Sequence, residues 1–264
     1  MQTTETISGD DVAYDRFIAD VYDSSPYFGQ GKARELEKFN APYFRRLAGR
    51  TGRILEFGSG TGMLTVPLAR AGYQIDSVDI SPFMHDVLTR KLQNEEPRVL
   101  SNVNQILSDA TTYIGPEPYN SIVMPEGILI ALPSVDLQMS LLRSCHRNLA
   151  AGGRIHIDFF QPYYKAIYQE NLKEFSRFRT PTGETYLLTI EITNDKYSQI
   201  QHWKGTYTRV ENGESRDSTV VDLDFRYVFY SEIQLMLQLT GFQLIELDTE
   251  YADRRGFFLV AERI

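Results

Sequence analysis

Hydrophobic and polar residues follow two different rhythms along this chain, and the rhythms separate expected helices from expected strands. Apolar and aromatic side chains recur at helical spacing from Tyr14 to Tyr22 and again from Leu36 to Leu47, which predicts two helices near the N-terminus. From Arg53 onwards, short apolar runs alternate with longer amphipathic segments. Because strands that alternate with helices pair in parallel, this order predicts an α/β fold with a doubly wound, mostly parallel, seven-stranded sheet.

Helix-capping residues and glycines set the expected boundaries of these elements. Ser81 followed by Pro82 is typical of a helix start, because serine caps the helix and proline suits its first position. Pro67 is expected in the first turn of the preceding helix or at a kink. Helices are expected at 62–72, 81–93, 134–149 and 231–242. Strands are expected at 53–58, 73–80, 102–110, 119–127, 154–160, 243–252 and 256–264.

The alternation stops after the fifth expected strand. Three β-rich segments follow, with an Asn-Gly turn at Asn212, and this pattern predicts an antiparallel β insertion. The β-rich segments are 184–193, 197–210 and 218–229. We therefore interpret residues 1–264 as a single domain. Its parts are an N-terminal helical lid (1–48), a ligand-binding core (49–160 and 223–264) and a β insertion that forms an acceptor pocket (161–222).

The composition is that of an ordinary globular protein. Of the 264 residues, 42% are hydrophobic and 23% are charged. The formal net charge of −8 disfavours a nucleic-acid partner, because binding phosphates usually requires a basic surface. The N-terminus does not have the pattern of a secretory signal, and no apolar run reaches the roughly 18 residues of a membrane helix. We expect a cytoplasmic protein without a membrane partner, and the single cysteine excludes an internal disulfide.

The turn that follows the first expected strand carries the strongest chemical signal. It reads Gly58-Ser59-Gly60-Thr61-Gly62 and lies where parallel sheets bind ligands, at the carboxyl ends of their strands. Glycine lets a ligand approach the main chain closely. The dinucleotide fingerprint requires a third glycine three places after the second, and Met63 stands there instead. The turn therefore predicts a nucleotide-type cofactor and disfavours a nicotinamide dehydrogenase, although a tight turn without a ligand would have the same glycines.

Two aspartates follow the next strands at the same edge of the expected sheet. Asp79 ends the second strand, where a carboxylate can accept hydrogen bonds from both hydroxyls of a ribose. Asp109 ends the third strand, where it can meet an adenine edge. Asp76, by contrast, is expected to be a surface residue of its strand and not a second ribose ligand.

Taken together, "LEFGSGTG", "VDIS" and "SDA" resemble the motifs of class I methyltransferases, which use S-adenosylmethionine (SAM) and have a Rossmann-like fold. The resemblance implies that the three glycines of the turn pack against the methionine and ribose portions of SAM. It also implies that Glu56 helps to hold the amino group, that Asp79 takes the ribose hydroxyls and that Asp109 contacts the adenine. The complete predicted cofactor site is Tyr14, Tyr22, Glu56, Gly58, Ser59, Gly60, Gly62, Asp79, Ile80, Asp109, Ala110 and Pro125.

The flanking segments resemble a narrower group, the amino-sugar N-methyltransferases of antibiotic pathways. The matching residues are Tyr14, the Tyr22-Asp23 pair, Gly31-Lys32 and the Arg255-Gly256-Phe257-Phe258 segment. In that group the arginine points into the active site, and the match favours Tyr14 and Tyr22 as a lid over the cofactor. The group also carries a histidine just after the fourth strand, whereas residues 128–132 of this chain contain none.

Four residues are candidates for catalysis: Glu126, Tyr14, His156 and Arg255. Glu126 follows the fourth strand and is either a general base beside the acceptor or a loop carboxylate that faces water. His156 is a catalytic candidate on the fifth strand, although a strand histidine is more often a packed core residue. Arg255 either binds an anionic or hydroxylated acceptor or is a solvated loop residue. No metal site is predicted.

Methyl transfer mainly requires that an acceptor be aligned with the methyl group and shielded from water. We therefore expect a SAM-dependent methyltransferase with a small-molecule acceptor, and N-methylation is preferred. O-methylation of a hydroxyl or carboxyl group and C-methylation stay open. So does a protein that binds SAM without transferring its methyl group, such as a cyclase, because cofactor motifs report only binding. A homodimer formed through strands of the insertion is a further expectation.

Overall fold

The computed structural model describes residues 14–27, 36–161, 164–169, 171–254 and 256–264. Parts of the predicted lid, at 1–13 and 28–35, and the candidate Arg255 lie outside the described residues. The strands are β1 (Ile54–Phe57), β2 (Ile75–Asp79), β3 (Val103–Leu107), β4 (Tyr119–Met124), β5 (Leu149–Phe160), β6 (Leu172–Arg179), β7 (Thr185–Asp195), β8 (Ile200–Glu211), β9 (Glu214–Arg226), β10 (Phe242–Asp248) and β11 (Gly256–Arg263).

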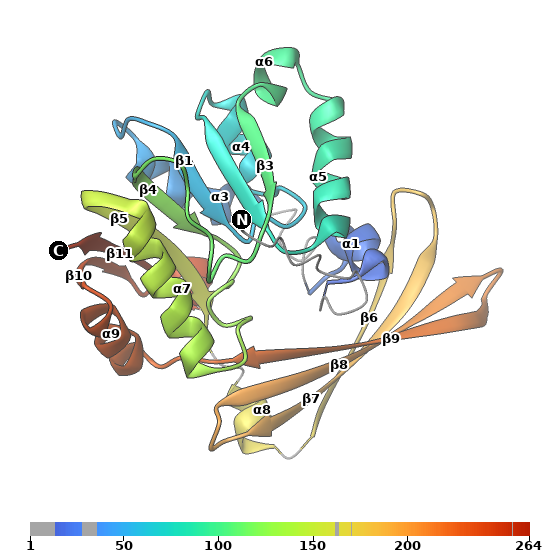
Figure 1. Ribbon diagram of the computed structural model, residues 1–264. Helices are drawn as coiled ribbons and strands as arrows, with labels where there is room; N and C mark the ends of the chain where they lie inside the picture. The colour runs from blue at the N-terminus through green and yellow to red at the C-terminus, as the bar shows by residue number, and fades with distance from the viewer. Residues whose placement is uncertain (1–13, 28–35, 162–163, 170, 255) are drawn as a thin grey trace, which may run out of the picture.

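The described strands form two separate sheets. The larger has seven strands in the order β10-β11-β5-β4-β1-β2-β3, and the smaller has four in the order β6-β7-β8-β9 (Figure 1). Strands β1 to β5 pair in parallel, whereas β11 pairs antiparallel with both β5 and β10. The mostly parallel, seven-stranded sheet with an antiparallel insertion after β5 is therefore confirmed.

Helices cover both faces of the larger sheet. The helices are α1 (Arg16–Val21), the 3₁₀ turn η2 (Tyr22–Ser24), α3 (Leu36–Leu47), α4 (Thr65–Arg70), α5 (Pro82–Gln93), α6 (Pro97–Leu100), α7 (Val135–Asn148), α8 (Tyr164–Tyr168), α9 (Tyr230–Leu239) and α10 (Tyr251–Arg254). One hydrophobic cluster joins α7 and α9 to one face of the sheet. A second joins α3, α4 and α5 to the opposite face.

Local signals in the sequence explain where several helices begin. Ser81 accepts a hydrogen bond from the backbone N–H of Met84 and so caps α5, which starts at Pro82 as predicted. Pro67 lies in the first turn of α4 as predicted, and the carbonyl oxygen of Met63, four positions earlier, accepts the side-chain amide of Asn40 at 3.0 Å in place of a backbone N–H. Strand β5 begins earlier than predicted, at Leu149, because this residue pairs with Tyr119 of β4.

The smaller sheet contains a strand that the sequence pattern did not predict. In β6 the apolar residues Leu172, Phe175 and Phe178 are three positions apart, so the segment lacks the alternation that indicates a strand. It becomes a strand by pairing along its whole length with β7. The sheet also extends beyond the predicted insertion, since β9 ends at Arg226.

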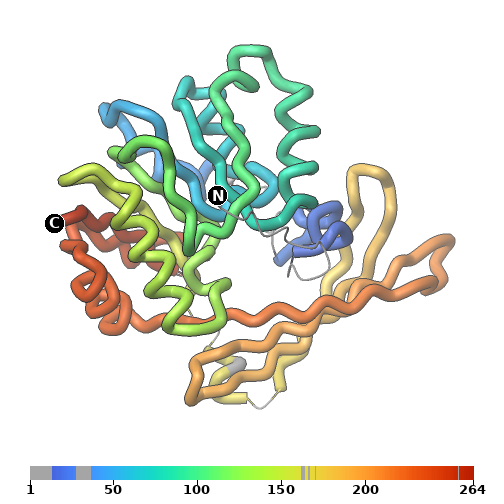
Figure 2. The backbone as a smooth tube through the Cα atoms, viewed as in Figure 1, coloured from blue at the N-terminus to red at the C-terminus, as the bar shows by residue number. Residues whose placement is uncertain are grey.

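Helix α1 lies between the smaller sheet and α5 (Figure 2). Ile18 and Val21 of α1 are buried in one hydrophobic cluster with Leu188 and Ile190 of β7 and with Met84 of α5. Figure 2 also shows β9 returning from the far tip of the smaller sheet to the core, where α9 begins. The smaller sheet is thus attached to the core through both α1 and β9.

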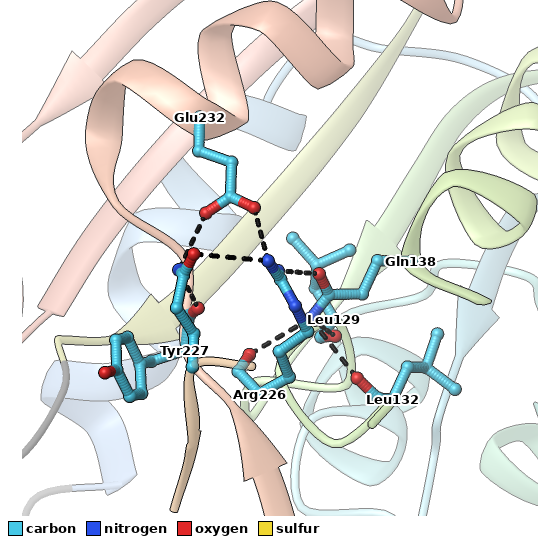
Figure 3. A network of polar contacts seen from close by, with 7 residues as sticks. Leu129, Leu132, Gln138, Arg226, Tyr227 and Glu232 are labelled. Carbon is cyan, nitrogen blue, oxygen red and sulfur yellow. Dashed lines mark hydrogen bonds and ion pairs between the residues drawn. The ribbon is translucent and has the colours of Figure 1, made fainter. Parts of the chain in front are cut away.

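The end of β9 is anchored by a buried polar network (Figure 3). Arg226 donates from Nη1 to Oε1 of Gln138 on α7 (2.7 Å) and from Nη2 to Oε1 of Glu232 on α9 (2.6 Å). Its backbone N–H donates to the carbonyl oxygen of Ile130 at 2.8 Å. Gln138 in turn donates to the carbonyl oxygen of Leu129 at 3.0 Å. These contacts join the smaller sheet to the loop between β4 and α7.

Asp76 corrects one prediction made from the sequence. Its side chain is buried, with 4% exposed, and its Oδ2 accepts the hydroxyl of Tyr119 at 2.6 Å. Oδ1 accepts a hydrogen bond from Asn104 at 3.0 Å and lies 3.3 Å from Nη1 of Arg53. The prediction of a surface residue was wrong, because these three partners compensate a carboxylate that the strand pattern alone left unpartnered.

No helix within the described ranges is both long enough and apolar enough to cross a membrane.

Candidate active site

A cavity of about 220 Å³ lies at the carboxyl ends of β1 to β4. A smaller cavity of about 20 Å³ shares Tyr22, Gly58, Gly60, Pro125 and Glu126 with it. The larger cavity is lined by Tyr14, Tyr22, Gly58, Gly60, Val78, Asp79, Ile80, Met84, Ser108, Asp109, Ala110, Thr111, Pro125, Glu126, Ile128, Ala131, Leu132 and Leu141. Nine of the twelve predicted cofactor residues are in this lining, the exceptions being Glu56, Ser59 and Gly62; Ser59 lines the smaller cavity.

The glycine turn has the backbone that its sequence requires. Gly58 and Gly60 adopt φ values of +70° and +53°, in the left-handed region that L side chains rarely adopt. A Cβ atom on Gly58 would lie 2.6 Å from Cδ1 of Ile128, whereas a Cβ on Gly60 would meet no atom within 4 Å. Gly58 is thus needed for packing within the protein, while Gly60 leaves open space beside the cavity, where a ligand can approach the main chain.

The Asp79 carboxylate ties the glycine turn to the end of β2. Its Oδ2 accepts the backbone N–H of Gly60 at 2.7 Å, and its Oδ1 accepts the N–H of Ser81 at 2.9 Å. Burial raises the pKa of Asp79, and the two backbone hydrogen bonds oppose that shift. Ser81 also donates its hydroxyl to the carbonyl oxygen of Tyr14 at 2.7 Å, so the same corner positions the backbone of Tyr14.

Asp109 is held at the neighbouring strand end by its own loop. Its Oδ1 accepts both the backbone N–H and the hydroxyl of Thr111, each at 2.8 Å. This local pattern fixes the carboxylate at the cavity wall without help from distant segments. Asp79 and Asp109 are therefore both held rigidly in the cavity lining.

Glu56 lies outside the cavity lining but directly precedes the glycine turn. Its side chain is completely buried (0% exposed), and Oε2 accepts the hydroxyl of Thr65 at 2.7 Å. Oε1 has no hydrogen-bond partner among the described residues. Burial raises the pKa of Glu56 to about 8. A buried carboxylate oxygen without a partner is costly, and a cationic amino group of a ligand would compensate it.

Tyr14 and Tyr22 bring aromatic rings to the cavity from the N-terminal segment. The ring centroids lie 6.2 Å apart in an edge-to-face arrangement. Burial raises the pKa of both phenols, and the nearby carboxylates of Asp79 and Glu126 raise them further. Both side chains therefore stay protonated and uncharged, as a lid over a cofactor requires.

Glu126 follows β4 and lines both cavities. Its backbone is left-handed, with φ +63°, and its N–H donates to Oδ1 of Asp158 at 3.0 Å. The sequence left open whether Glu126 lies beside the acceptor or on a loop that faces water. Its place in the lining of both cavities favours the first. On the same loop, Ile128 and Leu132 line the larger cavity where the resembling group carries a histidine.

Comparison with known proteins identifies the domain that contains this cavity. Residues 54–153 match the family model of the methyltransferase domain. This chain is a SAM-dependent methyltransferase. It is similar to a cypemycin N-terminal methyltransferase from Streptomyces sp., with 25% identity over 213 residues that cover 79% of this chain and 78% of that protein.

Two solved structures share the fold of this methyltransferase. The CcbJ methyltransferase from Streptomyces caelestis superposes with a TM-score of 0.73 at 22% identity, covering 93% of this chain and 96% of the other. The sugar N-methyltransferase KedS8 from Streptoalloteichus sp. ATCC 53650 has a TM-score of 0.71 at 19% identity, covering 100% and 98% of the two chains. The shared fold thus extends well beyond the matched domain.

The residues of this methyltransferase fit SAM. The cavity combines open space beside Gly60 with two fixed carboxylates, and Glu56 offers an unsatisfied buried oxygen to an ammonium group. A sulfonium cofactor with an amino group, a ribose and an adenine matches these features.

His156 is not part of the cavity lining, so the geometry gives no support to its predicted catalytic role. It pairs with Val123 and Val260, whose side chains lie in the cluster on the α3 face of the sheet. The ring is 1% exposed, and neither nitrogen has a partner among the described residues. Burial lowers the pKa of His156 to about 3.

Sequence reasoning missed two tyrosines close to the site of this methyltransferase. Tyr43 of α3 and Tyr251 of α10 both donate their hydroxyls to Asp158, the residue that holds Glu126. In the sequence, Tyr43 is one member of an apolar helix stripe and Tyr251 lies in the strand expected at 243–252, so neither carries a local sign of this role. Only the fold brings the two hydroxyls to one carboxylate.

Proposed function

We propose that this methyltransferase transfers the methyl group of SAM to an amine nitrogen of a small-molecule or peptide acceptor. The observation that carries the proposal is the position of Glu126, a carboxylate at the junction of the two cavities. A carboxylate there can accept a hydrogen bond from an amine N–H and thereby orient the nitrogen lone pair.

The cofactor side of the proposal assigns a role to each fixed group. Asp79 accepts hydrogen bonds from the ribose hydroxyls, and Asp109 accepts one from the adenine amino group. Glu56 holds the amino group of the methionine portion, for which its Oε1 has no other partner among the described residues. Gly60, which leaves open space beside the cavity, lets the cofactor reach the main chain.

When bound, SAM supplies an electrophilic methyl group on a sulfonium sulfur. Tyr14 and Tyr22 cover this position as uncharged side chains and exclude water, which would compete with the acceptor. Glu126 receives the proton that the acceptor nitrogen must lose, either before attack or from the methylated ammonium. Because the amine needs only orientation and one proton acceptor, the apolar Ile128 and Leu132 beside Glu126 are compatible with N-methylation.

The names of similar proteins support the same reaction class. One relative is described as a methyltransferase of the cypemycin N-terminus, and KedS8 is described as a sugar N-methyltransferase. These acceptors belong to a peptide and to a sugar, and both names point to nitrogen.

The proposal is tested by methyl transfer from SAM with an isotope-labelled methyl group. The acceptors are amino sugars, small amines, peptides with free N-termini, phenols, hydroxy acids and carboxylates, with products identified by mass spectrometry. Label on nitrogen is expected, and it should form roughly 100-fold more slowly in Glu126→Gln while S-adenosylhomocysteine still binds. Label on oxygen or carbon alone would replace N-methylation by the corresponding alternative, and binding without transfer to any acceptor would favour a protein that only binds SAM.

A further inference from the structure

Within the described ranges, Asp158 accepts hydrogen bonds from three separate parts of the chain. It lies near the end of β5 and is 1% exposed. Its Oδ1 accepts the hydroxyl of Tyr43 on α3 and the backbone N–H of Glu126, the latter at 3.0 Å. Its Oδ2 accepts the hydroxyl of Tyr251 on α10 at 3.0 Å. The three donors compensate the burial of the carboxylate, so Asp158 can be charged inside the protein.

Tyr43 also contacts the backbone that leads from β4 to Glu126. Its hydroxyl also lies 3.1 Å from the carbonyl oxygen of Met124, the last residue of β4. Burial raises the pKa of Tyr43 well above its usual value, and the adjacent Asp158 raises it further, so the hydroxyl keeps its proton. The backbone from Met124 to Glu126 is thus held through both a carbonyl oxygen and an N–H.

The backbone at Glu126 and Gly127 has an unusual conformation. Glu126 and Gly127 adopt φ values of +63° and +75° in succession. Glutamate rarely takes this left-handed conformation, and it persists only where surrounding contacts enforce it. The hydrogen bond from its N–H to Asp158 is such a contact, and the direction of the Glu126 side chain depends on it.

We propose that Asp158 and Tyr43 are positioning residues that fix the Glu126 carboxylate at the point of methyl transfer. Neither lines the cavity, so both act through the backbone of Glu126. This inference rests on the proposed function of Glu126 and adds the residues that make this function possible.

The chain offers a matched control for the experiment. Asp76 is also a buried aspartate on a sheet strand, and it accepts the hydroxyl of Tyr119 at 2.6 Å. Neither Asp76 nor Tyr119 lines the cavity. Asp158→Asn is therefore compared with Asp76→Asn, and Tyr43→Phe with Tyr119→Phe, so that each pair loses the same chemical group from a buried site.

The first measurement needs no acceptor. Hydrogen exchange of the Glu126 amide, followed by mass spectrometry of short peptides, is expected to accelerate about tenfold or more in Asp158→Asn, because its hydrogen bond is weakened. In Asp76→Asn this amide should exchange as in the wild type. Unchanged exchange in Asp158→Asn would overturn the proposal.

The second measurement is methyl transfer to the amine that the wild type methylates best. We expect kcat to fall about tenfold or more in Asp158→Asn and in Tyr43→Phe, with S-adenosylhomocysteine affinity within twofold of wild type. The control variants should keep kcat within twofold even where their Tm falls equally. If kcat follows Tm in all four variants, the two residues are merely structural.

A double-mutant comparison separates this inference from the proposed function. In a Glu126→Gln background, Tyr43→Phe should cost no further activity, because there is no carboxylate left to position. An additive loss in that background would contradict the positioning role. Full activity of Glu126→Gln alone would instead contradict the proposed function of Glu126, whatever the Tyr43 variant does.

Discussion

The two sides of the cavity are held together in different ways. On the cofactor side, Asp79 bonds to the backbone of Gly60 and Ser81, which are 19 and 2 positions away in the sequence. Asp109 bonds to Thr111, 2 positions away. On the side of Glu126, the side-chain hydrogen bonds to Asp158 from described residues span longer stretches: 32 positions to Glu126, 93 to Tyr251 and 115 to Tyr43.

The comparison shows that one side relies mainly on main-chain donors and the other on side chains from separate segments. A backbone N–H survives almost any substitution, so the cofactor side depends on few side chains. The side of Glu126 loses a contact whenever one of two tyrosines is replaced. We therefore expect substitutions on the two sides to separate binding from catalysis.

The largest effect is expected for Asp79→Asn. In this variant the side-chain NH₂ group would face the backbone N–H of Gly60 or Ser81. The single remaining oxygen could not accept hydrogen bonds from both ribose hydroxyls. Because hydrogen bonds to a charged group contribute about 1.5–3 kcal/mol each, binding of S-adenosylhomocysteine should weaken by roughly 4 kcal/mol, about a thousandfold. Isothermal titration calorimetry measures this, with Asp76→Asn as the control that keeps its affinity. Equal affinities of the two variants would remove Asp79 from the cofactor site.

Glu126→Gln should lower kcat and leave cofactor binding unchanged, the reverse of the effect expected for Asp79→Asn. The glutamine keeps the size of the side chain but cannot take a proton, so kcat should fall roughly 100-fold. Binding of S-adenosylhomocysteine should stay within twofold of wild type, as measured in the same titration. If Glu126→Gln instead binds S-adenosylhomocysteine more weakly and keeps its kcat, Glu126 acts in cofactor binding and not in catalysis.

A pH titration sharpens the role of Glu56. Its pKa of about 8 means that it is protonated in the free protein at neutral pH, whereas holding an ammonium group requires the charged form. Affinity for S-adenosylhomocysteine should therefore rise about tenfold from pH 6.5 to pH 7.5, with release of a proton. In Glu56→Gln this rise should disappear; if it persists, another group is responsible.

The smallest effect concerns His156, two positions before Asp158 on the same strand. Burial lowers its pKa to about 3, so the unfolded chain binds a proton more readily than the folded protein. The stability that the folded protein gains from the neutral His156 is fully present above pH 6.5 and is lost as the pH falls towards 3. At pH 5.5 it amounts to about 1.4 kcal/mol of lost stability.

The check on His156 is denaturant unfolding at pH 7.5 and pH 5.5. His156→Leu should lose less stability than wild type between the two pH values, because leucine does not titrate. Its methyl transfer at pH 7.5, measured on the folded fraction, should be unchanged. An equal loss of stability in both proteins would contradict the assignment, and a large loss of kcat would restore His156 as a catalytic candidate.

Sequence reasoning succeeded where the decisive interactions are local. The order of β1 to β5, the cap at Ser81, the first-turn Pro67 and the glycine turn all depend on neighbours within a few positions. Asp79 and Asp109 were expected at strand ends and lie there in the cavity lining. Their roles towards the cofactor stay predictions, although the methyltransferase domain and its use of SAM are confirmed.

Sequence reasoning failed where long-range packing determines the structure. Strand β6 has apolar residues at helical spacing and is a strand because β7 pairs with it. Asp76 was expected at the surface and is buried by Tyr119 and two further partners. For His156 the sequence left catalysis and a packed core position open; the ring is buried on the α3 side of the sheet, and a catalytic role stays a prediction.

By itself, the sequence determined the parallel core, the glycine turn at the cavity and the two carboxylates beside it. These features follow from hydrophobic periodicity, glycine conformations and strand ends, which are all properties of short segments. Only the tertiary structure decided that Tyr43, Tyr251 and Glu126 meet at Asp158, and that Arg226 joins the smaller sheet to the loop after β4. The physical reason is that a buried carboxylate or guanidinium needs several partners, and the fold supplies them from segments that no local pattern connects.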